Sequence, residues 1–207
     1  FHKMLDGCPD FHRVITPELA KNYSLRQIKH SYYFFPWNND PFNLLESVNK
    51  RWRIFKFLGG FPLDAYENNL PSTGVVDRLQ IAQYPSGVGE LELHSDPFEN
   101  QKIAISGIMS KRGKDYKTGG AYILNSNKEK VDIEDDMDIG DIYLVYPTVF
   151  HGVETIDKGS EVDWSSFVGR WFMGLYSNAS DLYAKRHTCY GVEDAINSGS
   201  TEILHPR

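Results

Sequence analysis

The stretch that decides the fold is residues 75–96, VVDRLQIAQYPSGVGELELHSD, in which two alternating runs flank a turn. Residues 76–84 and 90–95 are rich in apolar, β-branched and aromatic side chains that repeat with a period of two, as in a β-strand. Pro85-Ser86-Gly87 supplies the turn between them. We therefore predict two neighbouring strands here and a strand-rich domain around them.

The same short period continues toward the C-terminus. Further runs of this kind, separated by glycine-containing turns, occur at 102–109, 120–125, 141–147 and 167–176. Short strands at regular spacing indicate a β-sandwich or barrel rather than a parallel sheet with alternating helices.

The N-terminal third has a different pattern. Asp40-Pro41 provides a cap and a first helical position, and apolar residues at helical spacing follow as far as Gly59-Gly60: Leu44, Leu45, Val48, Trp52 and Phe55. We predict an amphipathic helix over 41–58 that backs the sheet. A second helix is expected at 17–29, where Thr16-Pro17-Glu18 provides a start signal.

Length and composition fit one globular domain. A chain of 207 residues with 41% hydrophobic and 14% aromatic residues can bury one substantial core. We divide it into a helical and mixed support region at 1–74, a strand core at 75–176 and a C-terminal extension at 177–207. The net charge of −6 argues against nucleic acid as a partner, because phosphate binding needs a basic face.

Cysteine content and hydropathy bear on the compartment. Only Cys8 and Cys189 occur, which favours free thiols in a reducing cytoplasm over a disulfide framework. No apolar run is long enough for a membrane span, and no signal-peptide pattern opens the chain. The first residue is Phe1 rather than Met, so removal of an upstream targeting segment is an alternative that the sequence leaves open.

The predicted strand 90–95 leads into an HxD motif. Strand alternation places Glu92, His94 and Asp96 on one face. A polar strand face usually meets solvent, and one HxD arises easily by chance in a chain of this length. The motif alone therefore carries little weight.

A second histidine changes that balance. His151 follows the predicted strand 141–147 and immediately precedes Gly152-Val153. Two histidines and one carboxylate can bind iron(II) on one face of its octahedron and leave three positions open, which oxygen chemistry requires. A structural zinc site would instead close its coordination, usually with cysteines, and none lies nearby in the sequence.

Arg170 is the remaining candidate. It lies within 167–176, whose two faces are both largely apolar, so the strand is expected to be buried with one arginine inside. A buried guanidinium needs an anionic partner, which is either a protein carboxylate in a structural ion pair or the carboxylate of a ligand. Its planar fork suits a two-pronged grip on either one, and a neighbouring iron site favours the ligand.

The motifs together resemble those of the 2-oxoglutarate/iron(II) oxygenases, in the prolyl-hydroxylase-like branch. The resemblance covers about half of the chain, residues 75–176, and depends on the order and approximate spacing of four blocks: Tyr84-Pro85-Ser86-Gly87 through His94-Ser95-Asp96, Gly119-Gly120-Ala121-Tyr122-Ile123-Leu124, Gly140-Asp141 through His151-Gly152-Val153, and Arg170. It implies a mainly β fold, a double-stranded β-helix (a jelly-roll or cupin-like barrel) with flanking N-terminal helices.

The resemblance also implies the cofactors and their ligands. His94, Asp96 and His151 would hold iron(II), 2-oxoglutarate would chelate it, and Arg170 would pair with the far carboxylate of that cosubstrate. A tyrosine at the position of Tyr84 lies near the cosubstrate in such enzymes. The segment between His151 and Arg170 is longer than the family usually has, so the assignment of Arg170 depends on the strand alignment there.

The implied reaction consumes 2-oxoglutarate and O2 and releases succinate and CO2 while it oxidises an unactivated C–H bond. Asp96 favours hydroxylation, because halogenating relatives lack this carboxylate; desaturation, cyclisation and epimerisation stay open. Glu92 either contacts a basic or hydroxylated group of the substrate or lies in water at the barrel mouth. The acidic stretch from Asp132 to Asp138 is interpreted as a solvated loop.

We expect the substrate to be a small polar metabolite. The alternatives are a peptidyl-prolyl hydroxylase, a cupin-type metalloenzyme that does not use 2-oxoglutarate, and a non-enzymatic jelly-roll binding module. Cupins generally carry more histidines and lack the late interior arginine, so Arg170 discriminates between these classes.

Overall fold

The computed structural model describes residues 10–15, 26–180 and 190–191. Two helical elements occur among them, α2 (Leu44–Leu58) and the short 3-10 helix η1 (Pro71–Thr73). The strands are β1 (Asp10–Ile15), β2 (Gln27–Phe34), β3 (Val75–Pro85), β4 (Glu90–Ser95), β5 (Ala104–Ile108), β6 (Gly120–Leu124), β7 (Lys130–Asp132), β8 (Ile142–Val145), β9 (His151–Glu154), β10 (Gly169–Ala179) and β11 (Tyr190–Gly191).

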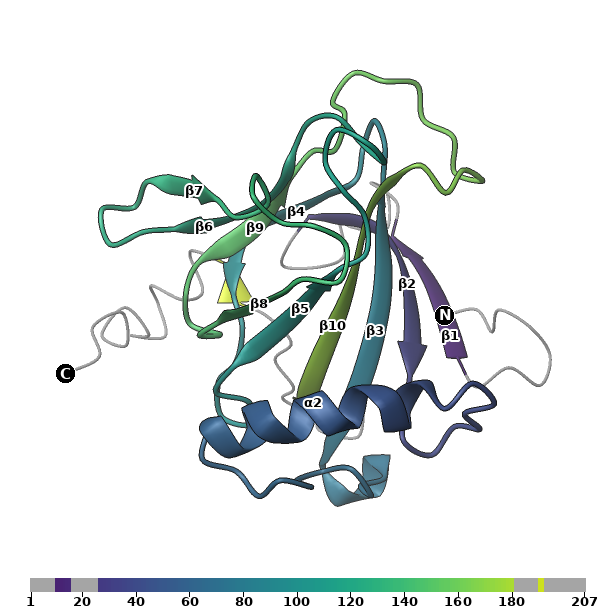
Figure 1. The fold of residues 1–207 in the computed structure, drawn as a ribbon, viewed down its shortest axis with the longest axis vertical. Coiled ribbons are helices and arrows are strands. Elements are labelled where there is room, and N and C mark those ends of the chain that lie inside the picture. Colours follow the sequence, from purple (N-terminus) through teal and green to yellow (C-terminus); the bar gives the residue numbers. More distant parts are fainter. Residues whose placement is uncertain (1–9, 16–25, 181–189, 192–207) are drawn as a thin grey trace.

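The strands form a curled antiparallel sheet whose two layers meet at β2 (Figure 1). One layer has the order β7-β6-β9-β4, and the other has the order β2-β3-β10-β5-β8. The first residues of β2, Gln27 and Ile28, pair with β4, whereas residues from His30 onward pair with β3. The fold is therefore mainly β, a double-stranded β-helix, which confirms the predicted fold class.

Strand alternation assigns the residues of β3 to two environments. Arg78, Gln80 and Tyr84 line the space between the layers. Leu79 points the other way, toward α2. The antiparallel partner β10 follows the same rule, with Arg170 opposite Tyr84 and Tyr176 opposite Arg78.

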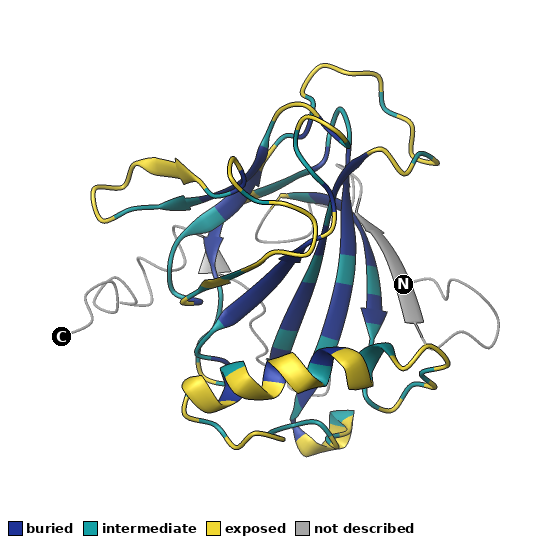
Figure 2. Ribbon diagram, viewed as in Figure 1, coloured by how far each residue is buried: buried dark blue, intermediate teal, exposed yellow. Residues whose placement is uncertain are grey.

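Helix α2 covers the outer face of this layer (Figures 1 and 2). Its buried residues Val48 and Trp52 pack against strand residues of the same apolar cluster, namely Leu79, Ile105 and Leu175. Full burial of each large apolar side chain stabilises the fold by about 1.5–3 kcal/mol. The exposed side of the helix faces solvent.

The predicted helix over 41–58 is confirmed, but it begins at Leu44. Asp40 still caps it from four residues upstream, because its two carboxylate oxygens accept the N–H groups of Leu44 and Leu45 at 2.8 Å each. At the other end the N–H of Gly59 donates to Phe55 O, as the Gly59-Gly60 stop signal predicts.

The predicted helix at 17–29 is wrong where it can be checked. Residues from Gln27 belong to strand β2, and residues 17–25 lie outside the described part of the chain. The run QIKHSYYF is buried along most of its length and contributes aromatic residues to the sheet, which outweighs the start signal upstream.

Four described strands within residues 10–154 were not predicted: β1, β2, β7 and β9. Two of them carry little apolar signal, since β7 is three exposed residues and β9 is only four residues long. The first third of the chain thus supplies two strands of the sheet as well as a covering helix. Cys8 and Cys189 lie outside the described residues, and no described helix is long and apolar enough to cross a bilayer.

Candidate metal centre

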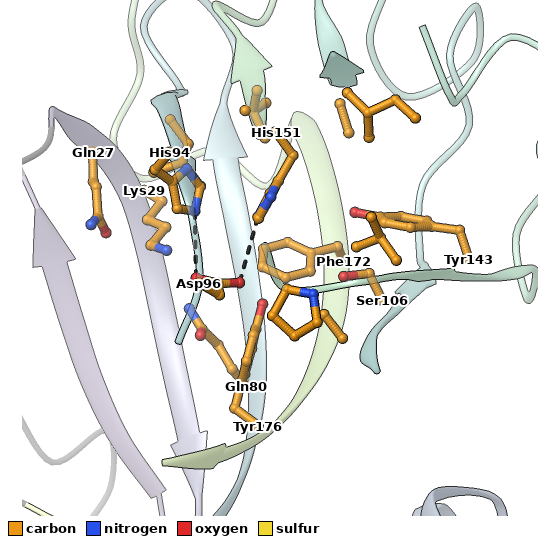
Figure 3. Close-up of a pocket in the computed structure, with 18 of the residues that line it drawn as sticks. Gln27, Lys29, Gln80, His94, Asp96, Ser106, Tyr143, His151, Phe172 and Tyr176 are labelled. Carbon is orange, nitrogen blue, oxygen red and sulfur yellow. Dashed lines mark ion pairs between the residues drawn. The ribbon is translucent and has the colours of Figure 1, made fainter. Parts of the chain in front are cut away.

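A cavity of about 140 Å³ lies between the two layers of the barrel. Both layers line it: β4 and β9 contribute histidines, while β3 and β10 contribute Gln80, Phe172 and Tyr176 (Figure 3). The cavity therefore lies where the jelly-roll prediction places a metal.

His94, Asp96 and His151 converge in this cavity. His94 lies near the end of β4 and His151 begins β9, and the two are paired across the strands. The Nε2 atoms of His94 and His151 lie 3.7 Å and 3.5 Å from the two carboxylate oxygens of Asp96. All three ligand atoms lie within 4.8 Å of one another, so one metal ion could contact all of them (Figure 3).

The backbone sets the orientation of both imidazoles. Nδ1 of His94 donates to Glu92 O, and Nδ1 of His151 donates to Val149 O, each at 2.8 Å. A carbonyl oxygen can only accept, so each Nδ1 carries a proton, and in the neutral imidazole Nε2 then has a lone pair available to a metal. This arrangement is typical of metal-binding histidines.

The electrostatics favour the metal-binding forms of His94 and Asp96, but not of His151. Burial, reinforced by the neighbouring His151, lowers the pKa of His94 to about 4, which keeps its imidazole neutral. Burial opposes ionisation of Asp96, but its hydrogen bond to His151 and the histidine charges outweigh that effect and lower its pKa. Burial likewise opposes a charge on His151, yet Asp96 raises its pKa. Two imidazole nitrogens and one carboxylate fit iron(II).

Glu92 does not face this cavity, contrary to the strand-alternation prediction. A β-bulge explains the difference: Leu91 pairs with Val153 and His94 with His151, so two residues of β4 oppose one residue of β9. The extra residue turns Leu91 and His94 to the same side and leaves Glu92 exposed. The Glu92 carboxylate accepts the N–H of Arg26 at 2.9 Å instead.

Arg170 is buried in the cavity wall, with 2% of its surface exposed, and it has a protein partner. Its Nε donates to Glu134 Oε1 at 2.7 Å, and its Nη2 donates to the same oxygen. Nη1 has no hydrogen-bond partner among the described residues. Burial opposes the charge of this guanidinium, but Glu134 outweighs it and raises its pKa.

Glu134 corrects the interpretation of the acidic stretch as a solvated loop. Its carboxylate is buried, accepts the hydroxyl of Tyr116 at 2.6 Å and lies against Arg170. Burial opposes ionisation, but the charge and hydrogen bond of Arg170 lower the pKa of Glu134 below its ordinary value. One acidic residue of seven consecutive positions thus belongs to the core, a distinction that charge pattern alone does not make.

Tyr84 lies next to Arg170 on the adjacent strand. It is 1% exposed, its ring stacks on Phe172 with centroids 5.7 Å apart, and the Arg170 Cζ lies 5.4 Å from its ring centre. Burial raises the pKa of its hydroxyl, so Tyr84 is neutral at physiological pH.

Several residues that line the cavity were not singled out from the sequence, and four of them carry charged or polar groups near the candidate site: Lys29, Arg78, Gln80 and Tyr176. For three of these four residues, strand alternation indicates the same face as a residue that was singled out. Arg78 and Gln80 share the strand period of Tyr84, and Tyr176 shares that of Arg170. Lys29 had no such indication, because its segment was predicted to be helical.

Comparison with known proteins shows which solved structures share this fold. No protein-family model and no curated protein matches the sequence. Among solved structures, a prolyl-4-hydroxylase from Pseudomonas putida matches with a TM-score of 0.50 and 10% identity, over 82% of this chain and 92% of that one. The chain therefore has the double-stranded β-helix fold found in the 2-oxoglutarate/iron(II) oxygenase superfamily, with a prolyl hydroxylase as a structural neighbour.

Two further structures match less closely. A putative 2OG-Fe(II) oxygenase family protein from Caulobacter crescentus has a TM-score of 0.45 and 11% identity, over 97% of this chain and 78% of that one. A full-length Neurospora crassa protein crystallised in complex with alpha-KG has a TM-score of 0.41 and 13% identity, over 92% and 73%.

Proposed function

We propose that this protein is an iron(II)- and 2-oxoglutarate-dependent dioxygenase that hydroxylates a small molecule. The observation that carries the proposal is the convergence of His94, Asp96 and His151 inside the barrel, with one ligand atom of each within 4.8 Å of the others. Nothing in the packing of an ordinary core requires a buried histidine, a half-buried histidine and a half-buried carboxylate to meet in a cavity.

The three residues would hold iron(II) on one side and leave the cavity side open. Iron and cosubstrate, when bound, would supply the oxidising chemistry that converts 2-oxoglutarate and O2 to succinate and CO2 and hydroxylates a C–H bond. The chain itself contributes orientation and exclusion of water. Glu92 O and Val149 O fix the histidine rings, and the rings of Tyr84 and Phe172 cover one wall of the cavity.

Arg170 would bind the far carboxylate of 2-oxoglutarate through the side that carries Nη1. Glu134 occupies the side formed by Nε and Nη2, so it acts as a positioning residue that holds the guanidinium plane. A guanidinium has five N–H donors, enough for both carboxylates. Tyr84 would border the cosubstrate from the adjacent strand.

The small cavity supports a small-molecule substrate over a peptidyl-prolyl hydroxylase, which would need an extended peptide groove. The acidic net charge supports a partner other than nucleic acid, and the two-cysteine content supports the cytoplasm as its location.

Anaerobic calorimetry with iron(II), followed by 2-oxoglutarate, tests the proposal directly. We expect one iron(II) per chain and tight 2-oxoglutarate binding only after iron is present, with succinate release on admission of O2 and a metabolite panel. Asp96→Ala serves as the matched negative control. Iron binding without 2-oxoglutarate binding would support the cupin-type alternative, and absence of both would support the binding module.

A further inference from the structure

Arg78 is a second guanidinium in the cavity wall, on β3 at a position opposite Tyr176 of β10. Its Cζ lies 4.7 Å from the ring centre of Tyr33 and 5.1 Å from that of Tyr176. Arginine stacks readily on aromatic rings, so these two contacts fix the plane of the guanidinium inside the cavity.

Arg78 differs from Arg170 and Lys56 in having no carboxylate partner among the described residues. Arg170 pairs with Glu134 and Lys56 pairs with Asp77, but none of the ion pairs in the described part of the chain includes Arg78. Its Nη2 donates only to the neutral amide of Gln80, at 3.4 Å. Its Nε–H is buried and has no acceptor among the described residues. An anionic ligand in the cavity would give the guanidinium the counter-charge that no described residue supplies.

The charge of the cavity leads to the same conclusion. Lys29, Arg78 and Arg170 line it, and among its described lining residues Asp96 is the one carboxylate. Asp96 belongs to the candidate metal centre, and Glu134, which does not line the cavity, neutralises Arg170. Basic groups therefore outnumber acidic groups along the cavity wall, although the protein as a whole has a net charge of −6. Such a wall favours an anionic ligand over a cationic one.

The two guanidiniums belong to different parts of the cavity. Arg78 and Tyr84 are separated along β3 by roughly 20 Å, at about 3.3 Å per residue, and Arg170 lies opposite Tyr84. Tyr176 and Gln80, the neighbours of Arg78, lie beside Asp96 (Figure 3). A short dicarboxylate held at Arg170 therefore leaves Arg78 for a second anion near the metal ligands.

We propose that Arg78 binds the carboxylate of the substrate, and that the substrate is a small monocarboxylic acid. This inference rests on the proposed dioxygenase function, because it assigns the cosubstrate to Arg170. The planar guanidinium suits a carboxylate, and the limited cavity volume of about 140 Å³ restricts the acid to a small one.

The test is calorimetric titration of protein loaded with Mn(II) and 2-oxoglutarate, which prevents turnover. The probes are small carboxylic acids, each paired with its own primary amide. We expect at least one acid to bind tenfold or more tightly than its amide. In Arg78→Gln this preference should fall below about threefold, while Mn(II) and 2-oxoglutarate affinities stay unchanged. Arg51→Gln, on the exposed side of α2, controls for the loss of one positive charge.

Each other outcome overturns the inference. A preference for acid that survives in Arg78→Gln would make Arg78 a structural residue, and equal binding of all acids and amides would show that the substrate is not anionic. Loss of 2-oxoglutarate affinity in Arg78→Gln would show that the cosubstrate binds to Arg78 rather than to Arg170.

If Arg78→Gln does not fold, Arg78→Lys replaces it and should keep the preference for acid with weaker binding. Titration of metal-free protein separates the two proposals, since a preference for acid that depends on Arg78 would persist there even if the dioxygenase proposal failed.

Discussion

Arg170 and Glu134 form a buried ion pair in which two nitrogens of one guanidinium donate to a single carboxylate oxygen, Glu134 Oε1. The side chains are 2% and 4% exposed, so solvent screens this pair very little. Burial of both charges is costly, and each therefore depends on the other. The pair also restricts which face of Arg170 a ligand can reach.

Glu134→Gln should destabilise the protein and make its stability more dependent on 2-oxoglutarate. Removing one partner of a buried pair costs about 3–5 kcal/mol, and the amide retains only part of the hydrogen bonding. The cosubstrate carboxylate would supply the missing anion, so 2-oxoglutarate should raise the melting temperature of the variant more than that of the wild type. Thermal unfolding with and without 2-oxoglutarate measures this difference, and equal shifts in the two proteins would show that no ligand carboxylate reaches Arg170.

Arg170→Lys should weaken 2-oxoglutarate binding about ten- to a hundredfold, or about 1.5–3 kcal/mol. A lysine keeps the charge, but its single ammonium cannot face Glu134 and the cosubstrate with the same geometry. Iron binding should be retained, because Arg170 is no metal ligand. Calorimetry of the iron-loaded variant measures the affinity, and an unchanged value would leave Arg170 with the structural ion pair alone.

Replacing any one of the three metal ligands by Ala should abolish stoichiometric iron(II) binding without unfolding the domain. Their main described contacts, apart from the two Nδ1 bonds to backbone, are with one another. Metal content after anaerobic loading, with circular dichroism as the check on folding, tests this expectation. His30→Ala is a useful comparison, since His30 is buried in β2 but outside the candidate centre. Full metal retention in His151→Ala would exclude the assigned triad.

The Asp77 carboxyl should impose a pH dependence on stability that Asp77→Asn lacks. Burial, opposed by Lys56, raises its pKa to about 6, so the folded state binds this proton more tightly than the unfolded state. The resulting stabilisation is fully present below about pH 4 and is lost as the pH rises through about 6. The free energy of unfolding of Asp77→Asn minus that of the wild type should therefore increase by about 2–3 kcal/mol across this window. Urea titrations at several pH values measure it, and a pH-independent difference would contradict the expectation.

The parts of the fold that the sequence predicted are those with strong periodicity. Residues 76–84 and 90–95 match β3 and β4 closely, and the apolar helical spacing located α2. Strand β2 was missed because its residues follow a helix start signal, and their role in joining the two layers depends on partners far away in the sequence.

The candidate site, like the fold, was predicted from the sequence only in part. The triad and Tyr84 could be recognised because short motifs carry them. Glu92 was misplaced because a bulge interrupts alternation without any glycine or proline to mark it. Glu134 was overlooked because six other positions around it are solvated or lie near the surface, and its inward contacts are with residues distant in the chain, Tyr116 and Arg170.

The bulge in β4 has a consequence for how this chain can change over evolutionary time. The one extra residue lets Leu91 and His94, which are three positions apart, face the same side of the strand, whereas a regular strand does this for residues two positions apart. Leu93 or Glu92 could be exchanged for many other side chains with little effect on the metal ligand. Loss of one residue at either position would restore a regular two-residue spacing between Leu91 and His94, so His94 would still face inward with the HxD motif intact. A homologue could therefore be one residue shorter in this segment and keep the same metal ligands, so a one-residue gap here is weaker evidence against a metal centre than a substitution of His94 or Asp96.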